Sequence, residues 1–305
     1  MIASVYRIAW RVLPKLPQGL VIWFAHLAAD IVCLLGGSSV RQMQKNYERL
    51  SGRAVSKKEL REGVRSYFRC FAQMFTLSGW SAAEIESGCF WPDGARDAEW
   101  LKDGPVVLAL THSGNWDLAG AWFCQTHGKI VTVAEKLNPE DLFDQFVEFR
   151  ESLGMEIIGV GPGDHVFTEL VEKTQGRPVL VPLLADRDIS GAGIEVDLGH
   201  AKALVAAGPA ALALKLNRPL IAGHISYVYQ NGRWTVRALF SDPVEMPELR
   251  EGETETEALT RAWVDEISPV MIDHMVDWHM MQKVFVDDLD PQRLARARQR
   301  AEEDK

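Results

Sequence analysis

His112 and Asp117, five residues apart, are the side chains of this chain best suited to acid–base chemistry. Val106–Leu110 is a short apolar run rich in Val and Leu, which is typical of a buried strand in a mostly parallel sheet. An apolar stretch with helical character, Leu118–Phe123, follows. His112 is therefore expected just past the carboxyl end of a strand, where open α/β sheets place their chemistry.

The expected position of Asp117 is the first turn of the following helix, where a carboxylate is favoured. A tight turn at Ser113-Gly114-Asn115 would fold Asp117 back within hydrogen-bond reach of the imidazole. Such a pair is a general base with the carboxylate that orients it and stabilises its protonated form. The alternative is an ordinary turn at a strand end, because a His and an Asp at this spacing also occur by chance.

Charged side chains follow two other predicted elements. Asp186, Arg187 and Asp188 come directly after the apolar run 178–184, and three charges there would be costly if buried unpaired. They must be paired or exposed in a cleft. Arg150 lies near the end of a predicted helix, where a guanidinium facing the strand ends can grip phosphate bidentately. A solvated helix surface is the alternative for Arg150.

The elements that must position these side chains alternate between strand and helix. Apolar periodicity and turn residues predict strands at 106–110, 130–134, 155–160, 178–184, 194–198, 219–225 and 234–240, the last two joined by a hairpin at Asn231-Gly232. Helices are predicted at 2–13, 39–50, 57–77, 142–153, 165–173, 206–216 and 254–275. This alternation predicts an α/β fold, with a central mostly parallel sheet flanked by helices.

Charge divides the chain unevenly. Residues 1–70 hold twelve Lys or Arg against four Asp or Glu, while the whole chain carries −9, so the remainder is strongly acidic. This balance argues against broad nucleic-acid binding and fits one end resting on anionic lipid. A solvated charged helix face is the alternative. The predicted division is an N-terminal helical, membrane-associating segment at 1–80, an α/β core at 81–286 and a charged tail at 287–305.

The N-terminal segment contains two apolar stretches. Residues 2–13 form a short basic amphipathic helix, with Arg7 and Arg11 off its apolar face. Residues 20–36 are marginal as a membrane span, because Asp30 interrupts them, and are predicted to form a buried or interfacial helix. No signal peptide is convincing. Trp10 and Trp23 fit a lipid headgroup boundary and the protein core equally well.

Composition narrows the chemistry further. The four cysteines are widely spaced and form no C-x-x-C pair, which is typical of reduced thiols rather than a disulfide frame or zinc site. The chain has no H-E-x-x-H, Walker loop, G-x-S-x-G or dinucleotide fingerprint. We therefore expect no metal and no tightly bound cofactor.

The stretch THSGNWDLAG resembles the H-x-x-x-x-D motif of the glycerolipid and lipid A acyltransferase superfamily. Three further stretches, VAEKLNPEDLFDQFVEFRESLGMEII, LLADRDISGAGIEVDL and DWHMMQKVFVDD, are similar to one branch of it, the actinobacterial phosphatidylinositol mannoside acyltransferases. The resemblance covers nearly the whole chain.

The resemblance implies transfer of an acyl chain from acyl-CoA, as co-substrate, to a mannose hydroxyl of a phosphatidylinositol mannoside. It implies His112 as the base and Asp117 as the carboxylate that steadies it. Arg150 would bind substrate, Asp186 and Arg187 would form an acceptor-binding pair, and Glu195 competes with Asp186 for that role. The enzyme would act peripherally on the cytoplasmic face of the plasma membrane.

Three alternatives remain open at this stage. A lipid A precursor is another acceptor for the same chemistry. A hydrolase would use His112 to activate water on a thioester or phosphoester. A lipid-binding protein without turnover would tolerate substitution of both His112 and Asp117.

Overall fold

A seven-stranded sheet forms the centre of the molecule. The computed structural model describes residues 2–92, 99–136, 140–161, 165–189, 193–292, 294–295 and 298–299. The strand order is β1-β9-β8-β2-β5-β3-β4, and every neighbouring pair is parallel except β8 with β9. The predicted α/β fold with a mostly parallel sheet is confirmed. The strands are β1 (Cys89–Phe90), β2 (Val106–Leu110), β3 (Lys129–Glu135), β4 (Met155–Val160), β5 (Val179–Leu184), β8 (Leu220–Gln230) and β9 (Arg233–Phe240).

Both faces of this sheet are buried, as the continuous apolar runs predict. Along β2, Val107 and Ala109 belong to one hydrophobic cluster, while Leu108 and Leu110 belong to the other. This alternation follows from the two-residue period of a strand. On the Leu108 side lie α6 (Trp116–Thr126) and α7 (Glu140–Ser152). On the Val107 side lie α8 (Val166–Thr174), α9 (Gly208–Leu216) and α10 (Glu255–Asp273).

The β8–β9 hairpin turns where the sequence predicts it. Asn231 and Gly232 both have positive φ, at 51° and 78°, which suits the tight turns that join antiparallel strands. A second, two-stranded antiparallel sheet pairs β6 (Ile194–Leu198) with β7 (Ala201–Val205). The sequence does not predict β7, because its run AKALV is rich in residues that favour helix and continues into the alanine-rich helix α9.

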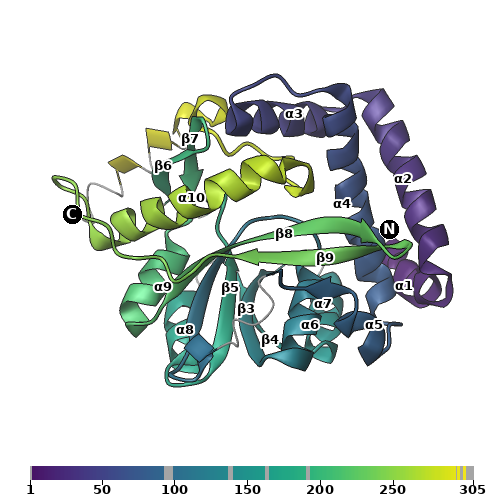
Figure 1. Ribbon diagram of the computed structural model, residues 1–305, viewed down its shortest axis with the longest axis horizontal. Coiled ribbons are helices and arrows are strands. Elements are labelled where there is room, and N and C mark those ends of the chain that lie inside the picture. Colours follow the sequence, from purple (N-terminus) through teal and green to yellow (C-terminus); the bar gives the residue numbers. More distant parts are fainter. Residues whose placement is uncertain are drawn as a thin grey trace.

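Four helices make up the N-terminal part of the chain: α1 (Ile2–Val12), α2 (Gln18–Leu35), α3 (Ser38–Ser51) and α4 (Lys57–Leu77). A capping box between Ser56 and Glu59 starts α4. The inner side of α4 contacts α6 and the 3-10 helix η3 (Met275–Asp277). Figure 1 shows α2 at the outer edge of the molecule, alongside α4. The domain boundaries at residues 80 and 286 remain predictions.

The two N-terminal tryptophans have different surroundings. Trp10 of α1 packs edge-on against Phe75 and Phe146, at ring-centroid distances of 5.4 and 5.0 Å. Trp23 of α2 is 58% exposed and touches the ring of Phe24, which is itself exposed. By its length and composition alone, helix α2 is long and apolar enough to cross a membrane. All four cysteines are free thiols, as predicted.

Candidate active site

His112 and Asp186 meet at the carboxyl edge of the sheet. Strands β2 and β5 are parallel neighbours, with Leu110 opposite Leu184. Two residues beyond that pair, His112 Nδ1 lies 2.6 Å from Asp186 Oδ1. The backbone N–H of His112 donates to the other oxygen, Oδ2, at 3.1 Å. The register of two central strands therefore sets the position of the imidazole against this carboxylate.

Asp186 is fully buried and is a hydrogen-bond acceptor on both oxygens. The indole N–H of Trp278 also donates to Oδ2, at 2.6 Å. Burial alone would raise the pKa of Asp186, but the charge of His112 and the hydrogen bonds from His112 and Trp278 outweigh it and hold the pKa below its usual value. Because an ionised carboxylate only accepts, the proton of the neutral imidazole sits on Nδ1. Nε2 is then the ring nitrogen free to act as a base.

Asp117 occupies the predicted first turn of α6, where the side chain of Asn115 caps the helix by accepting from the N–H of Leu118. Its predicted hydrogen bond to the imidazole, however, is wrong. The Oδ1 atom of Asp117 instead accepts from Arg150 Nε at 2.8 Å. Asp117 faces α7 across the helix pair, whereas Asp186 reaches His112 along the sheet.

The turn between His112 and α6 is tight. Gly114 has φ +52°, and a Cβ atom there would lie 2.6 Å from a methyl carbon of Ile225 and 2.7 Å from its carbonyl oxygen. A side chain is therefore excluded at this position. The N–H of Gly114 donates to the carbonyl of Asp277 at 2.9 Å. The N–H of Gly114 is consequently not available to bind a substrate oxygen.

A cavity of about 310 Å³ runs from His112 down one face of the sheet, beneath α6. Leu108 and Leu110 of β2 line it in the same alternating register as His112, so the histidine lies at its carboxyl-edge end. Its polar lining includes His112, Asp117, Arg150 and Arg187. Most of the remaining wall is apolar, from strands β3, β5, β8 and β9 and from α6. An apolar cavity with a few convergent polar groups is the usual form of a ligand site.

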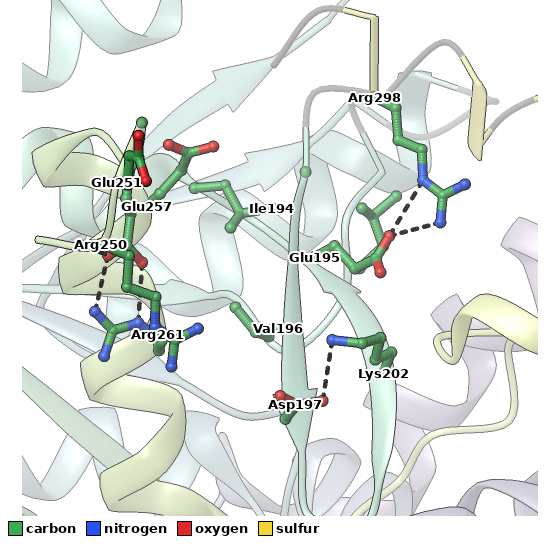
Figure 2. Close-up of a pocket in the computed structure, with 14 residues that line it drawn as sticks. Ile194, Glu195, Val196, Asp197, Lys202, Arg250, Glu251, Glu257, Arg261 and Arg298 are labelled. Atoms are coloured by element: carbon green, nitrogen blue, oxygen red, sulfur yellow. Dashed lines mark hydrogen bonds and ion pairs between the residues drawn. The ribbon is translucent and has the colours of Figure 1, made fainter. Parts of the chain in front are cut away.

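The remaining predicted site residues separate into two places. Arg187 lines the same cavity, and its buried Nε has no hydrogen-bond partner in the described part of the chain. Glu195, on β6, lies elsewhere, in a polar surface pocket where Arg298 binds it at 3.1 Å (Figure 2). Asp186 and Glu195 were the two candidates for the acceptor-binding acid. Asp186 lies beside His112, whereas Glu195 is on β6 in the separate two-stranded sheet, and the acceptor-binding role stays a prediction.

Trp278 borders the site, but the residue types around it do not predict this. It lies in the stretch DWHMMQKVFVDD, in which the sequence predicts no site residue. The available signal was the resemblance of this late stretch to its family counterpart.

Over the residues that the structure describes, no group of three or more His, Cys, Asp or Glu is placed to hold a metal ion.

Comparison with known proteins decides the family. The model of the bacterial lipid A biosynthesis acyltransferases matches residues 1–286. The chain belongs to this family. The acyltransferase is also similar to two proteins named phosphatidylinositol mannoside acyltransferase. That of Mycolicibacterium smegmatis is 32% identical over 305 residues, covering 95% of this chain and 93% of its own. That of Mycobacterium tuberculosis H37Rv is 31% identical over 302 residues, covering 97% and 92%.

The family and these relatives make the chain an enzyme that transfers acyl groups, with an acyl donor and a lipid acceptor. The names of the relatives support a place in glycolipid metabolism.

Proposed function

We propose that this enzyme transfers a fatty acyl chain from acyl-CoA to a mannose hydroxyl of a phosphatidylinositol mannoside. The observation that carries this proposal is the imidazole of His112, held by Asp186 at one end of an apolar cavity. The cavity suits a hydrocarbon chain, since each methylene buried there contributes about 0.8 kcal/mol. The choice of acceptor rests on the names of the relatives.

The proposed reaction is a direct attack. His112 Nε2 removes the proton of the sugar hydroxyl, and Asp186 stabilises the imidazolium that forms. The alkoxide attacks the thioester carbonyl, which forms the new C–O bond and a tetrahedral oxyanion. This intermediate collapses by breaking the C–S bond, and the departing CoA sulfur takes the proton from His112. Ester and CoA are the products, and the base is restored.

The hydroxyl of Ser113 and two buried thiols do not suit covalent catalysis. Ser113 is buried, and its hydroxyl is engaged by Thr111 and by the N–H of Ile225. Burial raises the pKa of the thiols of Cys70 and Cys89, so neither supplies a thiolate near neutral pH. Direct attack by the acceptor needs none of these groups.

The two arginines of the cavity differ in whether an acidic side chain binds them. Arg150 is bound to Asp117, whose charge raises the pKa of the guanidinium. Arg187 has no ion pair in the described part of the chain. We assign Arg187 to a phosphate of the donor or the acceptor, because a cation beside an apolar cavity is stabilised by an anion of the substrate.

The substrates are lipids, and the N-terminal helices offer a surface for reaching them. Helices α1 and α2 carry a series of exposed large apolar side chains: Ile8, Val12, Leu20, Trp23, Phe24, Leu27, Ile31, Leu34 and Leu35. An exposed apolar series of this kind marks an interaction surface. We propose that it enters the headgroup boundary of the plasma membrane from the cytoplasmic side, with the excess of Lys and Arg near the N-terminus against anionic lipid.

Replacing Trp23 and Phe24 together with serine is expected to weaken binding to vesicles at least tenfold, because burying each such side chain contributes roughly 1.5–3 kcal/mol. Co-sedimentation with phosphatidylinositol-containing vesicles measures this binding. Leu249→Ser is the control, since Leu249 is 51% exposed but lies outside these helices. Equal binding by the double variant and the control would reject this surface. Deletion of residues 1–17 is less informative, because it also removes the packing of Trp10.

An assay of the full chain on vesicles tests the proposed reaction. Long-chain acyl-CoA is supplied with a phosphatidylinositol mannoside, with a lipid A precursor, or with no acceptor. CoA release is followed together with the mass of the glycolipid. We expect acceptor-dependent CoA release and a mannoside heavier by one acyl group. Acylation of the lipid A precursor alone would change the acceptor, and free fatty acid without acceptor dependence would identify a hydrolase.

A further inference from the structure

The segment Asp277-Trp278-His279 is hydrogen-bonded to the turn that carries His112. The N–H of Gly114 donates to the carbonyl of Asp277 at 2.9 Å, and the N–H of His279 donates to the carbonyl of His112 at 2.7 Å. Together these bonds bracket a β-bridge between Ser113 and Trp278. The turn is thus paired on one side with a segment that lies near the opposite end of the sequence.

The side chain of Trp278 is fixed by its surroundings. It is fully buried, and its ring lies nearly parallel to Tyr47 and edge-on to Phe285. The hydroxyl of Tyr47 donates to the carbonyl of Trp278 at 2.9 Å. The indole N–H, which can only donate, is used on Asp186 Oδ2 at 2.6 Å. The indole lines no part of the cavity beside His112.

Building on the proposed function, we propose that Trp278 is a positioning residue for the general base. Its indole N–H fixes the carboxylate of Asp186 so that Oδ1 faces His112 Nδ1, which keeps the proton there and leaves Nε2 for the acceptor hydroxyl. Trp278 acts through Asp186 and does not touch the reacting atoms. Without the indole N–H, Oδ2 keeps one donor, the backbone N–H of His112, and the orientation of the buried carboxylate is fixed less firmly.

Loss of this donor also changes the proton affinity of the pair. The positive end of the N–H dipole favours the less protonated state, so its removal makes the His112–Asp186 pair take up a proton more readily. The base is active when unprotonated, and the acid limb of the kcat/KM–pH profile therefore moves to higher pH.

The neighbouring histidines do not produce this shift of the acid limb. Burial lowers the pKa of His224, on β8, to about 3 and that of His279 well below its usual value, so both stay neutral during the assay. The remaining charges bordering the cavity are the Arg150–Asp117 ion pair, on α7 and α6, Arg187, after β5, and Glu135, at the end of β3.

The test replaces one atom group. Incorporation of benzothienylalanine at position 278 keeps the shape of the indole and puts sulfur in place of N–H. Since a hydrogen bond to a charged group is involved, we expect kcat to fall about 10- to 100-fold. We expect KM for acyl-CoA to stay within twofold, because the ring does not contact the cavity, and the acid limb to rise by about one pH unit.

Trp263 supplies the matched control. It is fully buried in α10, and its indole N–H has no hydrogen-bond partner in the described part of the chain. The same replacement there changes the size and polarity of the side chain as much as at position 278, but it removes no hydrogen bond. Thermal unfolding is recorded for both variants. Unchanged kcat and pH profile at position 278, or an equal loss at position 263, would overturn the proposal. Full activity of His112→Ala would instead overturn the proposed function.

Discussion

Replacing His112 with alanine is expected to reduce acyl transfer about 10²- to 10⁴-fold while the fold and vesicle binding persist. The side chain is the proposed base, and general base catalysis contributes typically 10²–10⁴-fold. The imidazole is 30% exposed, and its hydrogen-bond partner among the described residues is Asp186, which keeps the donors at Trp278 and the backbone of residue 112. The protein therefore keeps its cavity and most of its bonds.

CoA release with a mannosylated acceptor measures this loss, with circular dichroism and thermal unfolding as checks on folding. His165→Ala is the matched control, because His165 is exposed at the start of α8 and its side chain makes no capping bond. Near wild-type turnover in His112→Ala would refute the assignment of the base and favour a lipid-binding protein.

Asp186→Asn is expected to lower kcat about 10⁴-fold, the cost of the same exchange in a serine protease triad. Asp186 receives donors on both oxygens, from His112 and from Trp278. An amide has one oxygen, so its NH₂ group must face a hydrogen-bond donor. As a result, the imidazole either changes to the other tautomer or loses its hydrogen-bond partner. The kcat and its pH profile, measured with the acylation assay, report the change.

Asp117→Asn is the informative companion, because it makes the same chemical exchange at a carboxylate bound to Arg150. Breaking a buried ion pair destabilises by roughly 3–5 kcal/mol, so the variant is expected to melt at lower temperature. Its pH profile should keep the wild-type acid limb. If Asp117→Asn moved that limb and Asp186→Asn did not, Asp117 would be the carboxylate that orients the base.

The position of His112 was predictable because it depends on local signals. An apolar run of strand length, a glycine turn and a helix follow one another directly along the chain, and they place the histidine at the sheet edge. Its orienting carboxylate was not predictable in the same way. Asp186 is distant in sequence, and it meets His112 only because β5 pairs with β2. Local spacing favoured Asp117, which points to α7 instead.

The same distinction applies elsewhere in the fold. Helix α4 and the β8–β9 hairpin were predicted well, because the helical period of apolar residues and the Asn-Gly turn are signals that lie within each element. Strand β7 was missed, since its partner rather than its composition makes it a strand. The environment of Trp278 depends on contacts with α3, β5 and the His112 turn, none of which a spacing reveals.

The pairing of the His112 turn with Trp278 has a consequence for biosynthesis. Synthesis makes α1 and α2 before the residues of the site, His112 before Asp186, and Trp278 after both. A nascent chain that stops between Asp186 and Trp278 therefore lacks the indole donor on Asp186 Oδ2, and the proposed set of proton-handling groups is assembled only after Trp278 has left the ribosome.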